Sequence, residues 1–323
     1  MATVKEILKE IYLMPELKLV EKKLEETVTS KSSLMTNFTG QMLKGGKRLR
    51  PLLIILSASF YPHSTISLVE AAAAAELIHT ASLVHDDIID KSFQRRGMPT
   101  INSEWGNHTA VLTGDFLFAK SFELLTKNKE YEILELMTYT ISLMCEGEIE
   151  QAHKTWDCTK TENDYLEQIY KKTSFFISAC CQAGGILCSM PHEELRHLAD
   201  YGLHLGYAYQ MTDDMLDFSS SPLTGKPEEN DLIQGNLNLP LLFLIKHPSY
   251  GERIKGIIQN RDLNPENMEF VRAAVHECGA LEYTYQKSKE RVMRAKANLQ
   301  YLPPAPAKKV LLNLADYIIN RKR

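Results

Sequence analysis

The chain has the pattern of one amphipathic helix after another. Apolar residues recur at helical spacing through most of it, and sustained apolar-polar alternation, which is typical of strands, is not found in the sequence. The pattern predicts helices over 4–27, 31–44, 48–60, 66–91, 106–127, 129–155, 161–189, 191–219, 231–246, 265–300 with a break near Gly279, and 307–321. We therefore expect an all-α protein. Because no Ser/Gly-rich linker or shift in composition divides the chain, we expect residues 1–323 to form a single domain.

Two of these helical runs end in the same acidic cluster, Asp-Asp-x-x-Asp. Its aspartates are Asp86, Asp87 and Asp90 in the first copy and Asp213, Asp214 and Asp217 in the second. Residues at i and i+4 share a helix face, so each copy projects a carboxylate pair from one place. A single such cluster is commonly a solvated helix face. The repeat, with apolar residues inside both copies, instead favours a site for Mg²⁺, which takes one or two carboxylates and leaves room for phosphate oxygens.

The composition of the chain indicates which classes of protein it can belong to. The 323 residues are 44% hydrophobic, which is enough for a large core, and the net charge of −4 gives no indication of a nucleic-acid partner. The six cysteines form no C-x-x-C pair, so we expect reduced thiols. The N-terminal segment lacks an export signal, and no apolar run approaches the roughly 18 residues of a membrane span. We expect a cytoplasmic protein with at most peripheral membrane contact. The basic tail at 321–323 could provide that contact, but a frayed, solvated terminus is the favoured interpretation.

Basic and polar residues that suit a diphosphate accompany the clusters. Lys47 and Arg50 lie in the segment GGKRLRP, where the two glycines allow a close turn. Arg95 and Arg96 follow the first cluster almost immediately. Further candidates, each of which could also be an ordinary surface or core residue, are His79, Lys172, Thr173 and Gln210. His85 and Asp86 could alternatively form the metal pair of an HD-type phosphohydrolase, although that reading leaves GGKRLRP and the second cluster unexplained.

The motifs GGKRLRP, LVHDDIIDKSFQRRG and YQMTDDMLDF, in this order, resemble the signature set of trans-isoprenyl diphosphate synthases, and the resemblance extends over essentially the whole chain. Stretches such as DLIQGNLNLPLLF look most similar to component II of heptaprenyl diphosphate synthases. The family resemblance implies the isoprenoid synthase fold, with antiparallel helices around a deep central cavity. It also implies an enzyme that condenses isopentenyl diphosphate with an allylic diphosphate, for which we expect farnesyl diphosphate.

The resemblance also implies residue roles. It assigns the six aspartates of the two clusters to about three Mg²⁺ ions that bridge the allylic diphosphate, and Arg95 to that diphosphate. It places isopentenyl diphosphate on Lys47, Arg50, His79 and Arg96. Lys172, Thr173 and Gln210 would line the allylic site near the reacting carbon, and Lys226 would add a phosphate contact. The family implies that Mg²⁺ promotes ionisation to an allylic cation, and the oxygens of Thr173 and Gln210 could stabilise that cation. One departure is Asn236, which stands where many relatives carry a lysine.

Small residues before the first cluster bear on product length. Short-chain family members carry an aromatic residue four or five positions before the first aspartate, where this chain has Ser82 and Ala81. The alanines of 71–75 continue the small surface, although they also suit close helix packing. We expect a heptaprenyl (C35) product for quinone side chains such as that of menaquinone. A hexaprenyl, octaprenyl or geranylgeranyl product and a terpene cyclase remain alternatives. The family includes homodimers and heterodimers with a small non-catalytic subunit, and a silent partner subunit would be expected to lack one acidic cluster.

Overall fold

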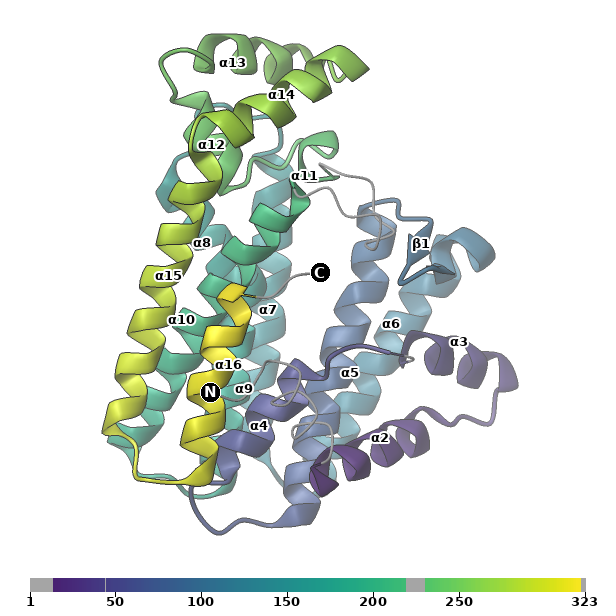
Figure 1. The fold of residues 1–323 in the computed structure, drawn as a ribbon. Helices are drawn as coiled ribbons and strands as arrows, with labels where there is room; N and C mark the ends of the chain where they lie inside the picture. The colour runs from purple at the N-terminus through teal and green to yellow at the C-terminus, as the bar shows by residue number, and fades with distance from the viewer. Residues whose placement is uncertain (1–13, 44, 219–229, 321–323) are drawn as a thin grey trace. The chain divides into compact units, whose positions relative to one another are not determined.

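The computed structural model describes residues 14–43, 45–218 and 230–320 (Figure 1). Apart from two strands of two residues each, the regular structure of these residues is helical, so the all-α prediction is confirmed. The elements are α2 (Pro15–Val28), α3 (Ser33–Leu43), α4 (Leu49–Ala58), α5 (Thr65–Ile89), β1 (Gln94–Arg95), β2 (Met98–Pro99), α6 (Ile101–Lys127), α7 (Tyr131–His153), α8 (Glu162–Ile169), the π-helix η1 (Tyr170–Ser174), α9 (Phe175–Leu187), α10 (His192–Asp217), α11 (Asn230–Ile233), α12 (Leu239–Ile245), α13 (Gly251–Asn260), α14 (Pro265–Glu277), α15 (Ala280–Asn298), the 3-10 helix η2 (Leu299–Tyr301) and α16 (Pro306–Asn320).

The chain divides into two compact units, each with its own contacts. Unit 1 comprises residues 1–141, 179–199 and 299–313, and unit 2 comprises 142–178, 200–298 and 314–323. The first acidic cluster belongs to unit 1 and the second to unit 2. The interpretation of the whole chain as one domain stays a prediction.

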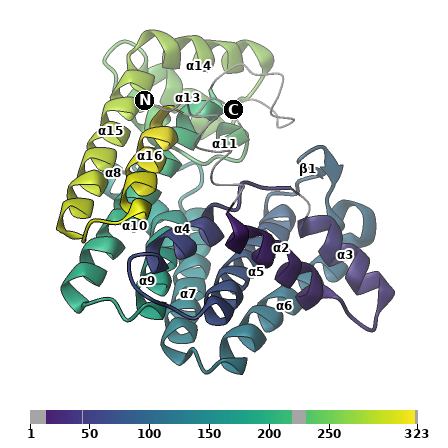
Figure 2. The same cartoon turned by 60° about the horizontal axis from the view of Figure 1, so that its bottom comes forward.

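Helix α5 forms the centre of unit 1. It runs beside α6 in both views, and α2 and α4 pack against it (Figures 1 and 2). Every residue from Leu68 to Ile78 is buried. Two carboxylates in this stretch have cationic partners, Glu70 with Lys23 at 2.8 Å and Glu76 with Arg48 at 2.9 Å. Pairing offsets the cost of burying these charges, so α5 can be enclosed on all sides.

The same helix is the one described segment with the length and apolar composition of a membrane span. However, 72% of its most apolar window is buried inside the protein. The core helix of a folded protein has the same apolar composition as a membrane span. The burial of α5 in unit 1 therefore accounts for its apolar sequence.

Unit 2 has a core of its own around α12. Leu241 and Leu244 of α12 are fully enclosed and belong to a cluster with Tyr165 of α8 and Phe218, which follows α10. Helices α13, α14 and α15 pack around α12. Tyr165 thus combines a core position with a polar hydroxyl, and that hydroxyl reaches the second acidic cluster.

The structure corrects the helix prediction at four places. The expected helix over 231–246 is two helices, α11 and α12, because Gly235 between them adopts a left-handed φ of 78°. The expected helix over 161–189 contains the π-helix η1. Helix α6 begins at Ile101 rather than 106, with a kink at Gly106 (φ 81°). Helix α13 was not predicted.

Candidate active site

The first acidic cluster forms the last turn of α5. Asp86 and Asp90 are half-buried and one turn apart, whereas Asp87 is only 2% exposed. The Asp87 carboxylate accepts hydrogen bonds from Nε of Arg95 at 2.9 and 3.0 Å, and its Oδ1 lies 2.8 Å from Nη2 of Arg95. The middle aspartate therefore holds the arginine, and the outer pair shares one helix face.

A two-residue hairpin carries the two predicted arginines past the end of α5. Gln94 pairs with Pro99 and Arg95 with Met98, and Arg96 adopts a left-handed φ of 52° at the tip. The Arg96 guanidinium lies against the glycine turn of GGKRLRP, since a Cβ added to Gly46 would meet its Nη1 and Nη2 at 3.1 Å. The hairpin and the glycine turn, separate motifs in the sequence, are thus neighbours in unit 1.

His79 lies near the same cationic residues. Its pKa is lowered well below the usual value, first by burial and then by Arg50, Arg96, Arg95 and Arg48. The imidazole is therefore neutral at physiological pH, able to donate one hydrogen bond and accept another. This part of unit 1 gathers four arginines and a neutral histidine, a composition suited to a diphosphate.

The basic residues of GGKRLRP differ in their surroundings. Arg48 is 7% exposed and binds Glu21, Glu76 and the carbonyl of Leu43, so its guanidinium ties α2 and α5 together. Lys47 is exposed and Arg50 is half-buried. This difference agrees with the assignment of Lys47 and Arg50, rather than Arg48, to a ligand.

The second acidic cluster repeats the arrangement of the first. Asp213 and Asp217 are half-buried on one face of α10, and the middle residue Asp214 is 3% exposed. The Asp214 carboxylate accepts a hydrogen bond from the Tyr165 hydroxyl at 2.6 Å and another from Nε2 of Gln210 at 3.0 Å. Burial and the nearby charge of Asp231 raise the pKa of Asp214 to about 7, although both hydrogen bonds lower it.

The π-helix η1 presents the predicted lysine and threonine of the allylic site. The Thr173 hydroxyl donates to Oε1 of Gln210 at 2.9 Å, and Nζ of Lys172 lies 2.6 Å from Oε1 of Glu148. Segment η1 contacts α10 closely, because a Cβ at Gly206 would lie 2.4 Å from the α-carbon of Ser174. A π-helix is rare and often marks a functional site. Thr173 and Gln210, predicted separately, are therefore in direct contact.

Helix α11 and the loop after it support the second cluster. The backbone N–H of Asp231 donates to Oδ2 of Asp217 at 3.3 Å, and Nδ2 of Asn238 donates to Oδ2 of Asp231 at 3.0 Å. Asn236, at the position of the noted departure, directs its amide to Gln234 within the loop at 3.1 Å. The loop itself thus provides no cation at this position.

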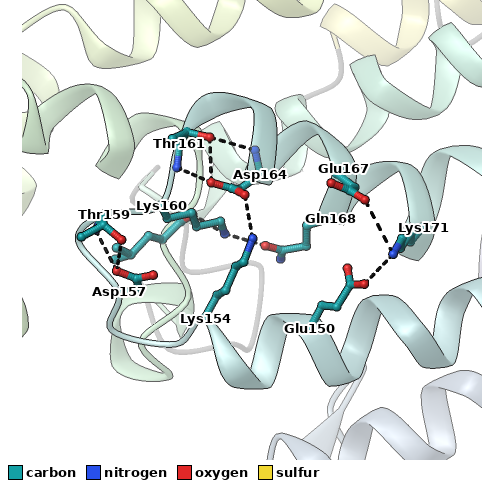
Figure 3. A network of polar contacts seen from close by, with 11 residues as sticks. Glu150, Lys154, Asp157, Thr159, Lys160, Thr161, Asp164, Glu167, Gln168 and Lys171 are labelled. Carbon is teal, nitrogen blue, oxygen red and sulfur yellow. Dashed lines mark hydrogen bonds and ion pairs between the residues drawn. The ribbon is translucent and has the colours of Figure 1, made fainter.

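A buried lysine also binds this loop. Lys160 is 5% exposed, and its ammonium donates to the carbonyl of Leu237 at 2.9 Å and to Oε1 of Gln168 at 2.5 Å (Figure 3). Burial lowers the pKa of Lys160 to about 8, although Asp214 and Asp231 act in the opposite direction. Lys160 therefore places a positive charge near Asp214 and Asp231.

The carboxylates fit a divalent ion that is shared with a ligand. Among the described residues, no three His, Cys, Asp or Glu side chains gather closely enough to hold a metal by themselves. Each cluster instead offers an outer pair of carboxylates on one helix face. Mg²⁺ commonly binds through one or two carboxylates and completes its shell with water and phosphate oxygens.

The chain-length candidates lie on α5 before the first cluster. Ala81 is fully buried, and Ser82 is half-buried with its hydroxyl donating to the carbonyl of His79 at 2.9 Å. Lys226 and the basic tail at 321–323 lie outside the described residues.

Three residues of the candidate site were not found from the sequence. Tyr165 could have been found from the sequence, because it precedes Lys172 by about two helical turns. Glu148 and Lys160 could not have been found, because only the fold brings each one to its partner. Glu148 pairs with Lys172, and Lys160 binds the carbonyl of Leu237.

Comparisons with known proteins identify similar chains. Residues 32–275 match the family model described as polyprenyl synthetase. The chain is 37% identical over 282 residues to octaprenyl diphosphate synthase of Escherichia coli strain K12, covering 86% of this chain and 87% of that protein. It is 35% identical over 313 residues to heptaprenyl diphosphate synthase component 2 of Bacillus subtilis strain 168, covering 96% and 89%. A polyprenyl synthase structure from Caulobacter crescentus CB15, complexed with calcium and isoprenyl diphosphate, matches with a TM-score of 0.93 at 30% identity, covering 99% and 98%.

Proposed function

We infer that this chain, which belongs to the polyprenyl synthetase family and is a prenyltransferase, extends an allylic diphosphate with isopentenyl diphosphate to heptaprenyl diphosphate. The family relationship also confirms the predicted isoprenoid synthase fold. The observation that carries the proposed site is the repeated geometry of the two clusters. In each, the first and third aspartates share a half-buried helix face, and the middle one is buried and hydrogen-bonded to neighbours.

The family depends on divalent metal ions, and we assign Mg²⁺ to the six aspartates of the clusters. The outer pairs Asp86 and Asp90, and Asp213 and Asp217, would be its direct ligands. Asp87 and Asp214 would support them. Bound Mg²⁺ supplies charge neutralisation for the leaving diphosphate. Because each outer pair provides only two carboxylates, the site would be complete only when a diphosphate joins it.

Isopentenyl diphosphate would bind in unit 1. Lys47, Arg50 and Arg96 would hold its phosphates, and neutral His79 would donate a hydrogen bond without adding to the positive charge. Arg95, held by Asp87, would orient the allylic diphosphate. This use of basic side chains argues against a terpene cyclase, which needs no isopentenyl diphosphate.

The reacting carbon of the allylic substrate would lie near Thr173 and Gln210. Their side chains are joined by a hydrogen bond of 2.9 Å, which fixes both oxygens relative to each other. Fixed dipoles stabilise developing positive charge without reorganising during the reaction. Lys172 would exchange Glu148 for a phosphate oxygen when substrate binds, and Lys226 would add a further phosphate contact.

The small residues of α5 support a long product, which we propose to have seven units. Ala81 and Ser82 leave no aromatic side chain within about one turn of Asp86, so α5 would not stop a growing chain there. Relatives are named for heptaprenyl and octaprenyl products, which supports a long product. We further propose that the product becomes a quinone side chain, as in menaquinone.

We propose a cytoplasmic enzyme, since both of its substrates are polar diphosphates. The name "component 2" of one relative supports a heteromeric assembly, and a homodimer is the other candidate. The arrangement of subunits determines whether this chain is active by itself.

One incubation tests function, product length and self-sufficiency together. The purified full chain is mixed with farnesyl diphosphate, isopentenyl diphosphate and Mg²⁺, and the dephosphorylated products are sized by chromatography. We expect a product of seven isoprene units that disappears when Mg²⁺ is chelated. Farnesyl diphosphate that is cyclised, or hydrolysed without incorporating isopentenyl units, would contradict the proposal. Activity that needs an added small subunit would identify the two-component form.

A further inference from the structure

Three hydrogen bonds connect the hydroxyl of Tyr165 to that of Thr173. The Tyr165 hydroxyl donates to Oδ2 of Asp214 at 2.6 Å, and Nε2 of Gln210 donates to Oδ1 of the same carboxylate at 3.0 Å. The amide oxygen of Gln210 then accepts from the Thr173 hydroxyl at 2.9 Å. All four residues belong to unit 2. They form a continuous relay from the core of that unit to the π-helix η1.

The relay determines which way the Gln210 amide faces. The NH₂ group of Gln210 donates to Asp214, and its oxygen accepts from the Thr173 hydroxyl, so each end of the amide has its own partner. With both ends engaged, the amide cannot rotate without breaking a hydrogen bond. The orientation of Gln210 therefore depends on a correctly placed Asp214 carboxylate.

Tyr165 is the fixed end of this relay. Its side chain is 2% exposed and packs in the apolar cluster around α12. Burial and the charge of Asp214 raise the pKa of Tyr165 well above its usual value, so its hydroxyl remains a donor. A hydroxyl that donates to a carboxylate at this distance makes one of the stronger hydrogen bonds in proteins. The ring is held by the core, and the hydroxyl in turn holds Asp214.

We propose that Tyr165 is a positioning residue that acts through Asp214 to keep the amide oxygen of Gln210 directed at Thr173. This rests on the proposed function, in which these two oxygens face the reacting carbon. Without the Tyr165 hydroxyl, the carboxylate would keep only the hydrogen bond from Gln210 and could rotate with it. The loss would affect the chemical step more than substrate binding, because Tyr165 is only 2% exposed and its hydroxyl donates to Asp214.

A double-mutant cycle tests the proposal. Tyr165→Phe removes one oxygen and keeps the ring, so we expect a folded protein whose kcat falls about tenfold while KM for both substrates changes less than about threefold. In a Gln210→Ala background, Tyr165→Phe should cost less than about twofold, because its target is gone. A tenfold loss in both backgrounds, or no loss in either, would overturn the inference. Tyr201→Phe, at a buried tyrosine of α10, is the matched control and should keep the wild-type kcat.

A second readout does not depend on turnover. In spectra of protein labelled with ¹⁵N-glutamine, the side-chain amide of Gln210 is identified by its absence from the Gln210→Ala variant. We expect this signal to shift and its protons to exchange faster in Tyr165→Phe, but not in Tyr201→Phe. An unchanged Gln210 signal would overturn the relay. A wild-type chain that makes no prenyl product while showing the expected spectral change would contradict the proposed function alone.

Discussion

At the scale of single residues, the middle and outer aspartates of the clusters differ. Asp87 and Asp214 are 2% and 3% exposed and hold Arg95 and Gln210, whereas the outer aspartates are half-buried. The sequence predicted all six as a group, because i and i+4 spacing is evident from the residues alone. The different environments of the middle and outer aspartates could not be predicted, because they depend on partners such as Tyr165 that only the fold brings close.

Lys160 leads to a prediction about stability and pH. Its pKa is about 8 in the folded protein, against an ordinary value of 10.5. Below about pH 8 the lysine is charged in both states, and the folded state bears the cost of burying that charge. As pH rises from 8 towards 10.5, the folded protein loses the proton first, so this residue's contribution to stability rises, by about 3 kcal/mol at most.

The measurement compares unfolding in urea for the wild type and Lys160→Met at pH 7.5 and pH 10. We expect the wild type to gain stability relative to the variant at the higher pH. Lys22→Met, which changes a lysine that is 74% exposed, should follow the wild type at both pH values. Parallel pH dependence of wild type and Lys160→Met would show that the ammonium is not buried at a cost.

At the scale of elements, α5 was predicted closely, since the expected range 66–91 became Thr65–Ile89. A long apolar pattern that ends in charged residues leaves little ambiguity. The π-helix η1 could not be predicted, because its sequence YKKTS continues the helical pattern without interruption. Its geometry follows from packing against α10 at Gly206, a tertiary contact.

That contact gives a prediction for Gly206. A Cβ there would lie 2.4 Å from the α-carbon of Ser174, so Gly206→Ala must move η1 away from α10. We expect a loss of about 1 to 3 kcal/mol in unfolding free energy, together with a fall in kcat as Thr173 moves. Gly256→Ala in α13 is the matched control, because nothing lies within 4 Å of the added Cβ, and it should gain roughly 0.5 to 1 kcal/mol. Equal effects of the two substitutions would refute the packing account.

The chain-length assignment belongs to α5. Phenylalanine in place of Ala81 would put an aromatic ring about one turn before the first cluster, so we expect the main product to shorten by several isoprene units. Product sizing by chromatography measures this, and Ile66→Phe, at a position of the same helix that is 69% exposed, should leave the distribution unchanged. Chain lengths that stay the same in Ala81→Phe, at a preserved melting temperature, would remove Ala81 and Ser82 from the product path.

At the scale of the whole molecule, we propose that the two clusters bind one diphosphate, although they belong to different compact units. The sequence motivated this claim through the repeat, and the structure adds that each cluster offers only an outer pair of carboxylates. Mg²⁺ held by two carboxylates completes its shell with water and phosphate oxygens, and we propose that one diphosphate supplies those oxygens to the ions of both clusters.

The most direct test measures initial rates of isopentenyl incorporation for Asp86→Asn, Asp213→Asn and the double variant at saturating Mg²⁺. If the clusters act as one unit, each single variant should lose on the order of a thousandfold in kcat, and the double variant should fall little further. Wild-type rates in either single variant, or losses that multiply in the double variant, would contradict a shared site.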